Sequence, residues 1–178
     1  MVPSHGVAAR ARLRYVFDGP VIDPPLPTAR SSVFLTQFET VGTSFHPVRR
    51  NHRFFVSWGF GTSFDDSPLV LSQFHLGRPF QLGAYDLGEL KGDHYYVATA
   101  GYLHELGRLP DFLGGPIYAG AWLENGDAFD DFDKATFRTQ PGLGVIMDTL
   151  IGPVLLGGTV GFDGRWATYI AVGRLFNW

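Results

Sequence analysis

The chain has 178 residues, of which 45% are hydrophobic and 17% charged, and its formal net charge is -3 at neutral pH. This length suits one domain over residues 1–178, and the weak negative charge without any Lys/Arg run argues against a nucleic-acid partner. No window holds the roughly 18 uncharged apolar residues of a membrane-spanning helix, so a helical membrane protein is excluded. Cys is absent, which excludes disulfides and thiolate metal sites.

Polar and apolar residues alternate along most of the chain, in runs separated by clusters of Gly, Pro, Asp and Asn. The alternation predicts an all-β fold of about nine antiparallel strands. The runs, about 10 to 14 residues long, exceed the typical 5 or 6 of soluble sheets and suit tilted membrane strands. We therefore expect a transmembrane β-barrel with strands near residues 8–18, 29–42, 52–61, 69–78, 93–106, 115–127, 137–150, 152–162 and 165–176.

The first run places three arginines on one face and apolar side chains such as Leu13 and Tyr15 on the other. Each arginine would cost a few kcal/mol near the middle of a bilayer, so this face is expected to point into a polar lumen. Two roles stay open, pairing with lumen carboxylates such as Glu39, which we favour, and an anion-selective wall. The three arginines are Arg10, Arg12 and Arg14.

Later runs repeat the pattern. The clearest, at 52–61, has an apolar face that includes Phe54, Trp58 and Phe60, whereas the run at 93–106 has tyrosines on both faces. By the same parity Trp166 and Trp178 point outward and Trp122 inward, which predicts a partial aromatic girdle.

Connections alternate in size as on the two sides of an outer-membrane barrel, apart from the periplasmic turn at 18–28. We expect tight turns at 64–68 and 150–153, and longer loops at 42–51, 79–92 and 127–136.

Three segments in the second half of the chain carry a family resemblance. The first is Phe-His-Leu-Gly-Arg-Pro-Phe-Gln-Leu-Gly-Ala-Tyr-Asp-Leu-Gly-Glu-Leu-Lys-Gly at 74–92, the second is Ala-Trp-Leu-Glu-Asn-Gly-Asp-Ala-Phe at 121–129, and the third is the ending from 152 to 176. In this order they resemble the C-terminal part of the bacterial surface antigen barrel. That barrel occurs in outer-membrane assembly factors and behind patatin-like phospholipase domains.

The resemblance implies a sixteen-stranded barrel, with about seven strands upstream of this chain, whose loop 79–92 folds into the lumen against an acid at Glu124. Assembly factors carry an Arg-Gly-aromatic loop tip, whereas this chain has Gly83, Ala84 and Tyr85, so it is closer to the patatin-associated branch. The implied loop motif is Leu82, Gly83, Ala84, Tyr85, Gly88, Glu89 and Gly92, and the implied C-terminal signature is Tyr169, Ile170, Val172 and Phe176.

The resemblance also implies a function and a location. The chain would be an outer-membrane barrel that anchors, or helps to translocate, an upstream passenger, with membrane lipid and the barrel assembly machinery as partners. The chain lacks an N-terminal signal, so we interpret it as the C-terminal piece of a longer precursor. Missing N-terminal strands or a second copy of the chain would complete the barrel. It has no Gly-x-Ser-x-Gly elbow, so any lipase activity would lie upstream, and we expect neither enzymatic activity nor a cofactor here.

Two other classes of protein stay open. A soluble lipocalin-like binding barrel would have the same alternation with the apolar face inside. An outer-membrane lipid hydrolase would need Ser and His together on outward strands, but parity puts Ser57 and His75 inward and Ser72 and His52 outward. The six His show no metal-ligand spacing, so no metal site is expected.

Overall fold

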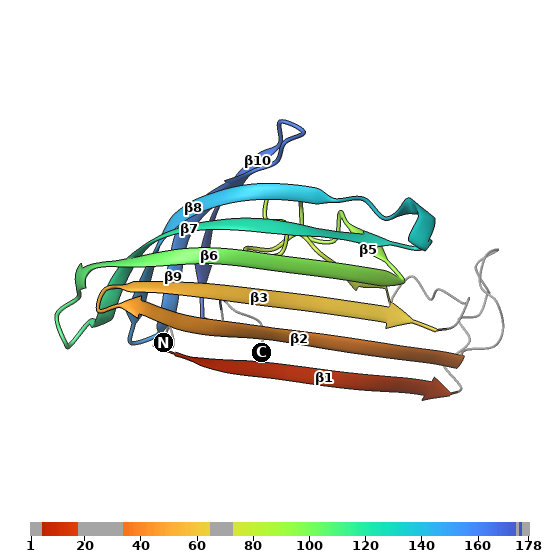
Figure 1. The fold of residues 1–178 in the computed structure, drawn as a ribbon, viewed down its shortest axis with the longest axis horizontal. Coiled ribbons are helices and arrows are strands. Elements are labelled where there is room, and N and C mark those ends of the chain that lie inside the picture. The colour runs from red at the N-terminus through yellow and green to blue at the C-terminus, as the bar shows by residue number, and fades with distance from the viewer. Residues whose placement is uncertain (1–4, 18–33, 65–72, 174, 176–178) are drawn as a thin grey trace.

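The computed structural model describes residues 5–17, 34–64, 73–173 and 175, and within them the fold is all-β and antiparallel, as predicted. Eight long strands form one curved sheet in the order β1-β2-β3-β6-β7-β8-β9-β10 (Figure 1). Their bounds are β1 Gly6–Phe17, β2 Phe34–Arg49, β3 His52–Ser63, β6 His94–Arg108, β7 Gly114–Phe129, β8 Arg138–Thr149, β9 Gly152–Val160 and β10 Trp166–Val172. Two short strands, β4 (Phe74–His75) and β5 (Lys91–Gly92), pair with each other, and η2 is a 3-10 turn at Phe132–Lys134.

The expected count of nine strands is corrected at residues 69–78. Within its described part only Phe74 and His75 are extended, and they pair with Lys91 and Gly92 rather than with the large sheet. β3 pairs directly with β6, so the chain between them leaves the sheet and returns. The large sheet therefore has eight strands, and its edge strands β1 and β10 run in opposite directions. A sixteen-stranded barrel would then need eight further strands rather than seven.

The connections lie at two opposite ends of the strands, and those at one end are mostly longer. Residues 50–51, 109–113 and 150–151 join strands at one end, while 18–33, 64–93, 130–137 and 161–165 join them at the other. Two expectations are wrong in detail. Residues 42–49 are strand, because β2 continues through Pro47 at a bulge, and residue 64 opens the longest connection rather than a tight turn. The turn expected at 18–28 lies outside the described residues.

The two faces of the sheet differ in chemistry. On the convex face, apolar side chains from several strands are exposed, among them Leu13, Phe54, Leu143 and Ile170. On the concave face, side chains from the same strands are buried under segment 74–92, which crosses this side of the sheet (Figure 1). The parity predicted for the clear strands is correct, and on β6 it resolves to Tyr95 and Val97 facing inward.

The concave side holds two clusters of buried apolar residues. One surrounds the middle of the sheet and contains Phe45, Phe55, Phe80, Leu103, Tyr118, Trp122, Ile146, Leu155 and Leu175. The other joins segment 74–92, called the inserted segment below, to β6. It contains Leu76, Leu82, Tyr85, Leu90, Tyr95 and Val97. Segment 74–92 therefore contributes side chains to both clusters and is an integral layer of the fold.

The sheet has two free edges in the described part of the chain, since neither β1 nor β10 pairs with a further strand and they do not pair with each other. Figure 1 shows the sheet bending round so that β9 and β10 lie behind β6 and β7, which makes a trough. No helix of the described residues is long and apolar enough to cross a membrane.

Candidate functional site

A row of polar residues crosses the floor of the trough beneath the inserted segment. The strand registers align one residue from each of five neighbouring strands, β2, β3, β6, β7 and β8. Because cross-strand partners point to the same face, all five side chains face inward. This polar row consists of Thr43, Ser57, Thr99, Glu124 and Gln140.

Glu124 is the acidic member of the polar row, and it is fully buried. Its Oε1 accepts hydrogen bonds from the backbone N–H of Phe80 at 3.0 Å and from Nε1 of Trp122 at 2.9 Å. Its Oε2 accepts one from the backbone N–H of Gly83 at 2.8 Å. A buried carboxylate is stable only when its oxygens are hydrogen-bonded, and here the inserted segment and β7 supply the donors.

The neighbouring members of the row hold the same stretch of backbone. Thr99 Oγ1 donates to the carbonyl oxygen of Phe80 at 2.7 Å, and the N–H of Ala84 donates to Oε1 of Gln140 at 3.0 Å. Three strands thus fix the segment's tip, residues 80–84. The sequence singled out Glu124 alone, because Thr99 and Gln140 join the site only through cross-strand register, which alternation does not reveal.

The tip has a strained backbone that turns its N–H groups toward Glu124. Phe80 and Leu82 adopt left-handed φ angles of 65° and 63°, which side chains other than Gly rarely take. Such alternation of backbone conformation forms a concavity whose N–H groups bind an acceptor, and here the acceptor is the carboxyl group of Glu124. Gly83 fits tightly, since a Cβ there would lie 3.0 Å from the Tyr169 ring and 3.2 Å from Thr159 Oγ1.

Tyr85 directly follows the tip and lies toward the connection between β9 and β10. Its hydroxyl donates to Oδ2 of Asp163 at 3.0 Å, and the guanidinium groups of Arg165 and Arg138 lie over its ring at 4.9 and 5.6 Å. Glu124 accepts its hydrogen bonds from Phe80 and Gly83, whereas Tyr85 contacts Asp163. Tyr85 ties the segment to the connection between β9 and β10.

The remaining motif residues close the segment on itself. Gly88 has a φ of 78°, and its N–H donates to the carbonyl of Leu76 at 3.1 Å. Glu89 accepts from the N–H of Asp86 at 3.1 Å and forms an ion pair with Arg165. Gly92 passes so close to β7 that a Cβ would lie 2.4 Å from the backbone nitrogen of Phe129.

The charged groups beside Tyr85 have shifted pKa values. The pKa of Glu89 lies below 4.5 because the N–H of Asp86 and then the guanidinium of Arg165 stabilise its ionised form. The pKa of Asp163 lies below 3.8 because of the backbone N–H of Arg165 and the hydroxyl of Tyr85. These carboxylates are therefore ionised at neutral pH and hold the tip by charge-assisted contacts.

Of the C-terminal signature, Tyr169 faces the trough, where it packs against the first apolar cluster. Ile170 and Val172 lie on the convex face and are exposed. Phe176, like Trp178, lies outside the described residues. The three described members thus divide between the two faces of β10, in keeping with the alternation.

The arginines of β1 face the trough as predicted. Arg12 lies opposite Glu39 in the register, but Glu39 accepts a hydrogen bond of 3.2 Å from the hydroxyl of Tyr95. Arg14 donates through Nη1 to Oε1 of Gln37 at 3.4 Å. No ion pair joins Arg10 or Arg12 to a carboxylate within the described ranges.

The residues weighed for hydrolase and metal chemistry do not assemble into such sites. Ser57 faces the trough, Ser72 lies outside the described residues, and His52 stacks on His104 on the convex face. One Ser/His pair that sequence reasoning missed is Ser44 and His46, whose Oγ and Nε2 lie 3.2 Å apart. No described acid contacts His46, and the described residues hold no group of three or more His, Asp or Glu suited to a metal.

Comparison of the chain with models of protein families and with curated proteins gives no match. The class is therefore defined by the fold and the site: a curved antiparallel sheet, apolar outside, with a segment held on a buried carboxylate inside.

Proposed function

We propose that the chain is the C-terminal part of an outer-membrane β-barrel that anchors, or helps to translocate, a passenger domain encoded upstream. The observation that carries this proposal is the distribution of polarity. Exposed apolar side chains cover the convex face, and the buried polar row lies on the concave face. In water this outer surface would exceed the few hundred Å² of apolar patch that a soluble monomer exposes, whereas in a bilayer it meets hydrocarbon.

The connections support an orientation in the membrane. Outer-membrane barrels have short turns on the periplasmic side and longer loops outside. The short connections 50–51, 109–113 and 150–151 would then be periplasmic, and the inserted segment would enter the lumen from the outer side. Held by Glu124, the segment would act as a plug.

The role toward a passenger rests on the resemblance of segments 74–92 and 121–129 to the bacterial surface antigen barrel. The inserted segment has Gly83 where assembly factors have the arginine, and this favours the patatin-associated branch. The free edges of β1 and β10 fit the same picture, because unpaired backbone groups in lipid cost several kcal/mol each. We propose that upstream strands cover these edges.

The soluble alternative, a lipocalin-like barrel, would place polar side chains outside. The exposed Leu123, Leu143 and Ile170 on the convex face argue against it. For the outer-membrane hydrolase, Ser44 and His46 supply two groups of a triad but lack a described acid to orient the histidine.

The test is to purify the full chain and compare its state in plain buffer and in non-ionic detergent. We expect aggregation in buffer and β-rich, monodisperse protein in detergent, and a monodisperse soluble β-protein in buffer would contradict the membrane location. Cold SDS gels test the missing strands separately. A compact, heat-sensitive monomer band from this chain alone would mean that β1 and β10 seal without further strands.

A further inference from the structure

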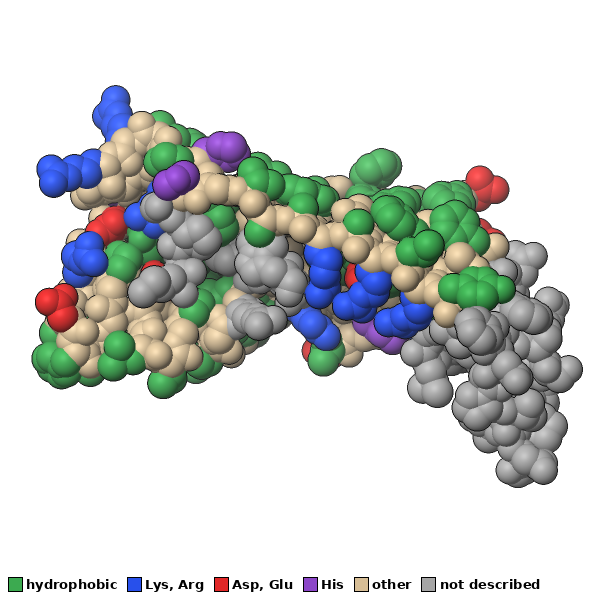
Figure 2. Space-filling view, turned by 90° about the horizontal axis from the view of Figure 1, so that it is seen from below, with side chains coloured by type: hydrophobic (Ala, Val, Ile, Leu, Met, Phe, Trp, Pro, Cys, Tyr) green, Lys and Arg blue, Asp and Glu red, His purple; other side chains and the backbone are tan. Residues whose placement is uncertain are grey.

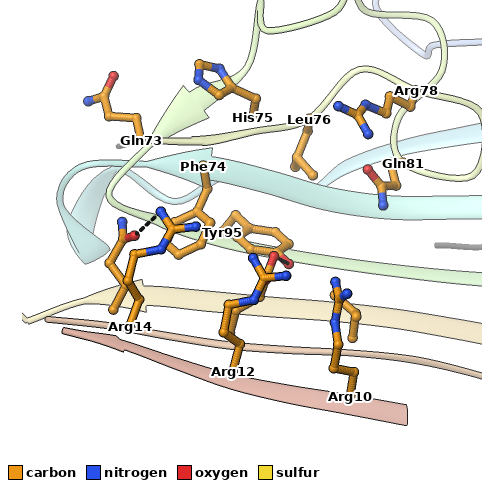
Figure 3. Close-up of a pocket in the computed structure, with 13 residues that line it drawn as sticks. Arg10, Arg12, Arg14, Gln73, Phe74, His75, Leu76, Arg78, Gln81 and Tyr95 are labelled. Atoms are coloured by element: carbon orange, nitrogen blue, oxygen red, sulfur yellow. Dashed lines mark hydrogen bonds between the residues drawn. The ribbon is translucent and has the colours of Figure 1, made fainter. Parts of the chain in front are cut away.

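A cavity of about 370 Å³ lies between β1 and the inserted segment. Arg10, Arg12 and Arg14 project into it from β1, and His75 and Arg78 border it from the segment opposite (Figure 3). The space-filling view from below shows cationic side chains gathered on this side of the molecule (Figure 2). The cavity is therefore lined by cations from two elements far apart in the sequence.

The described walls of this cavity do not balance its positive charge. Four arginines line it, but its only lining carboxylate among the described residues is Glu39, which accepts a hydrogen bond from Tyr95. Residues two apart on a strand are separated by about 6.6 Å, so three like charges follow one another on one face. Such an arrangement creates a positive potential that favours an anion.

We propose that this cavity binds a soluble anion carrying two or more phosphoryl groups. Guanidinium groups bind phosphate oxygens through paired N–H donors, and three of them in a row can hold more than one such group. The side-chain amides of Gln73 and Gln81 line the same space and can donate further hydrogen bonds. The cavity volume of about 370 Å³ is many times the ~30 Å³ that one water occupies, so the cavity admits more than a single small ion.

The position of the cavity indicates whether its ligand comes from water or from the membrane. It opens on the concave side of the sheet, opposite the exposed Leu13 and Tyr15 of the same strand. A ligand would therefore arrive from water, and the binding does not depend on the chain being a membrane protein. A lipid headgroup carries the same phosphate chemistry, so the experiment must separate the two sources.

Calorimetric titration of the folded full chain with tripolyphosphate, at constant ionic strength, tests the proposal. The variant R10Q/R12Q/R14Q should bind about tenfold or more weakly, and Arg12→Gln alone should bind measurably more weakly. The control R49Q/R50Q/R108Q removes the same charge at the opposite end of the strands and should bind within about twofold of the unchanged protein. Circular dichroism establishes that each variant is folded.

Two results of this titration would overturn the proposal. One is absence of tripolyphosphate binding, and the other is equal weakening in the pocket variant and the control, which would indicate bulk charge alone. A second arm adds micelles doped with phosphatidic acid. Failure to compete supports a soluble ligand, whereas full competition would assign the cavity to a lipid headgroup instead.

Discussion

The backbone N–H of Gly83 donates a hydrogen bond of 2.8 Å to Oε2 of Glu124, across 41 residues of sequence. The N–H of Phe80 donates to the other carboxylate oxygen, so one side chain of β7 holds the tip of the inserted segment at two points. Thr99 and Gln140 hold the same tip, but only Glu124 accepts two of its backbone N–H groups. We therefore expect Glu124 to contribute most to fixing the segment.

Replacing Glu124 by Ala should release the segment. The variant leaves the buried N–H groups of Phe80 and Gly83 without an acceptor, so we expect a loss of about 3 kcal/mol in the free energy of unfolding. Chymotrypsin should then cleave after Tyr85 and Leu87 about tenfold faster or more. Glu124→Gln keeps one acceptor oxygen and should give an intermediate rate.

The matched control is Glu105→Ala, which removes a carboxylate that pairs with Arg53 at 3.7 Å, away from the tip. Cleavage after Tyr85 should not change in this control. Equal cleavage rates in the Glu124→Ala variant and the unchanged protein would contradict the role of Glu124.

Acid should loosen the far end of the segment. The pKa values of Glu89 and Asp163 are lowered in the folded protein, so their stabilisation is present above the ordinary values of 4.5 and 3.8 and is lost as the pH falls through the lowered ones. Hydrogen exchange of residues 82–90, corrected for the intrinsic rate, should rise below about pH 4. The effect should be small, because exposed ion pairs contribute little.

The variant Arg165→Gln provides the comparison for this pH effect. It removes the ion pair to Glu89 and the cation over the Tyr85 ring, so exchange should already be faster at neutral pH and should respond less to acid. An identical pH response in both proteins would exclude these contacts as the cause.

A charge on the convex face should distinguish lipid from water. Leu143 lies in the middle of β8 and is 69% exposed. In a bilayer Leu143→Arg should cost about 2 to 4 kcal/mol, whereas at an exposed position in water it should be within about 0.5 kcal/mol of neutral. Leu150→Arg, in the turn after β8, should cost about 0 to 1 kcal/mol in lipid. Folding free energies in lipid vesicles measure both, and equal costs would contradict a membrane-embedded convex face.

The sequence predicts the β class and the sense of the pleat because alternation has a strict period of two. It fails at residues 69–78, where Phe74 and Leu76 alternate with Gln73 and His75 as they would in a strand. In the structure Leu76 packs into an apolar cluster within the inserted layer. A segment laid on an amphipathic surface needs the same alternation as a strand, so the pattern cannot separate the two.

The site is less predictable from sequence than the fold. Glu124 and the segment that covers it come from resemblance, but Thr99 and Gln140 join them through the registers of β6 with β7 and β7 with β8. Register depends on connection lengths and bulges, which composition does not specify. The same holds for β2, where a bulge near Pro47 lets the strand continue past residues that indicate a loop.

Quenching of single-tryptophan proteins by lipids brominated in the middle of the acyl chain tests the central claim most directly. Trp58 lies in the middle of β3 on the convex face, and Trp122 lies on the concave face, where it donates to Glu124. With the other three tryptophans replaced by Phe, the Trp58 protein should be strongly quenched in these membranes and the Trp122 protein should not. Unquenched Trp58, or equal quenching of the two, would contradict a sheet whose convex face lies in lipid.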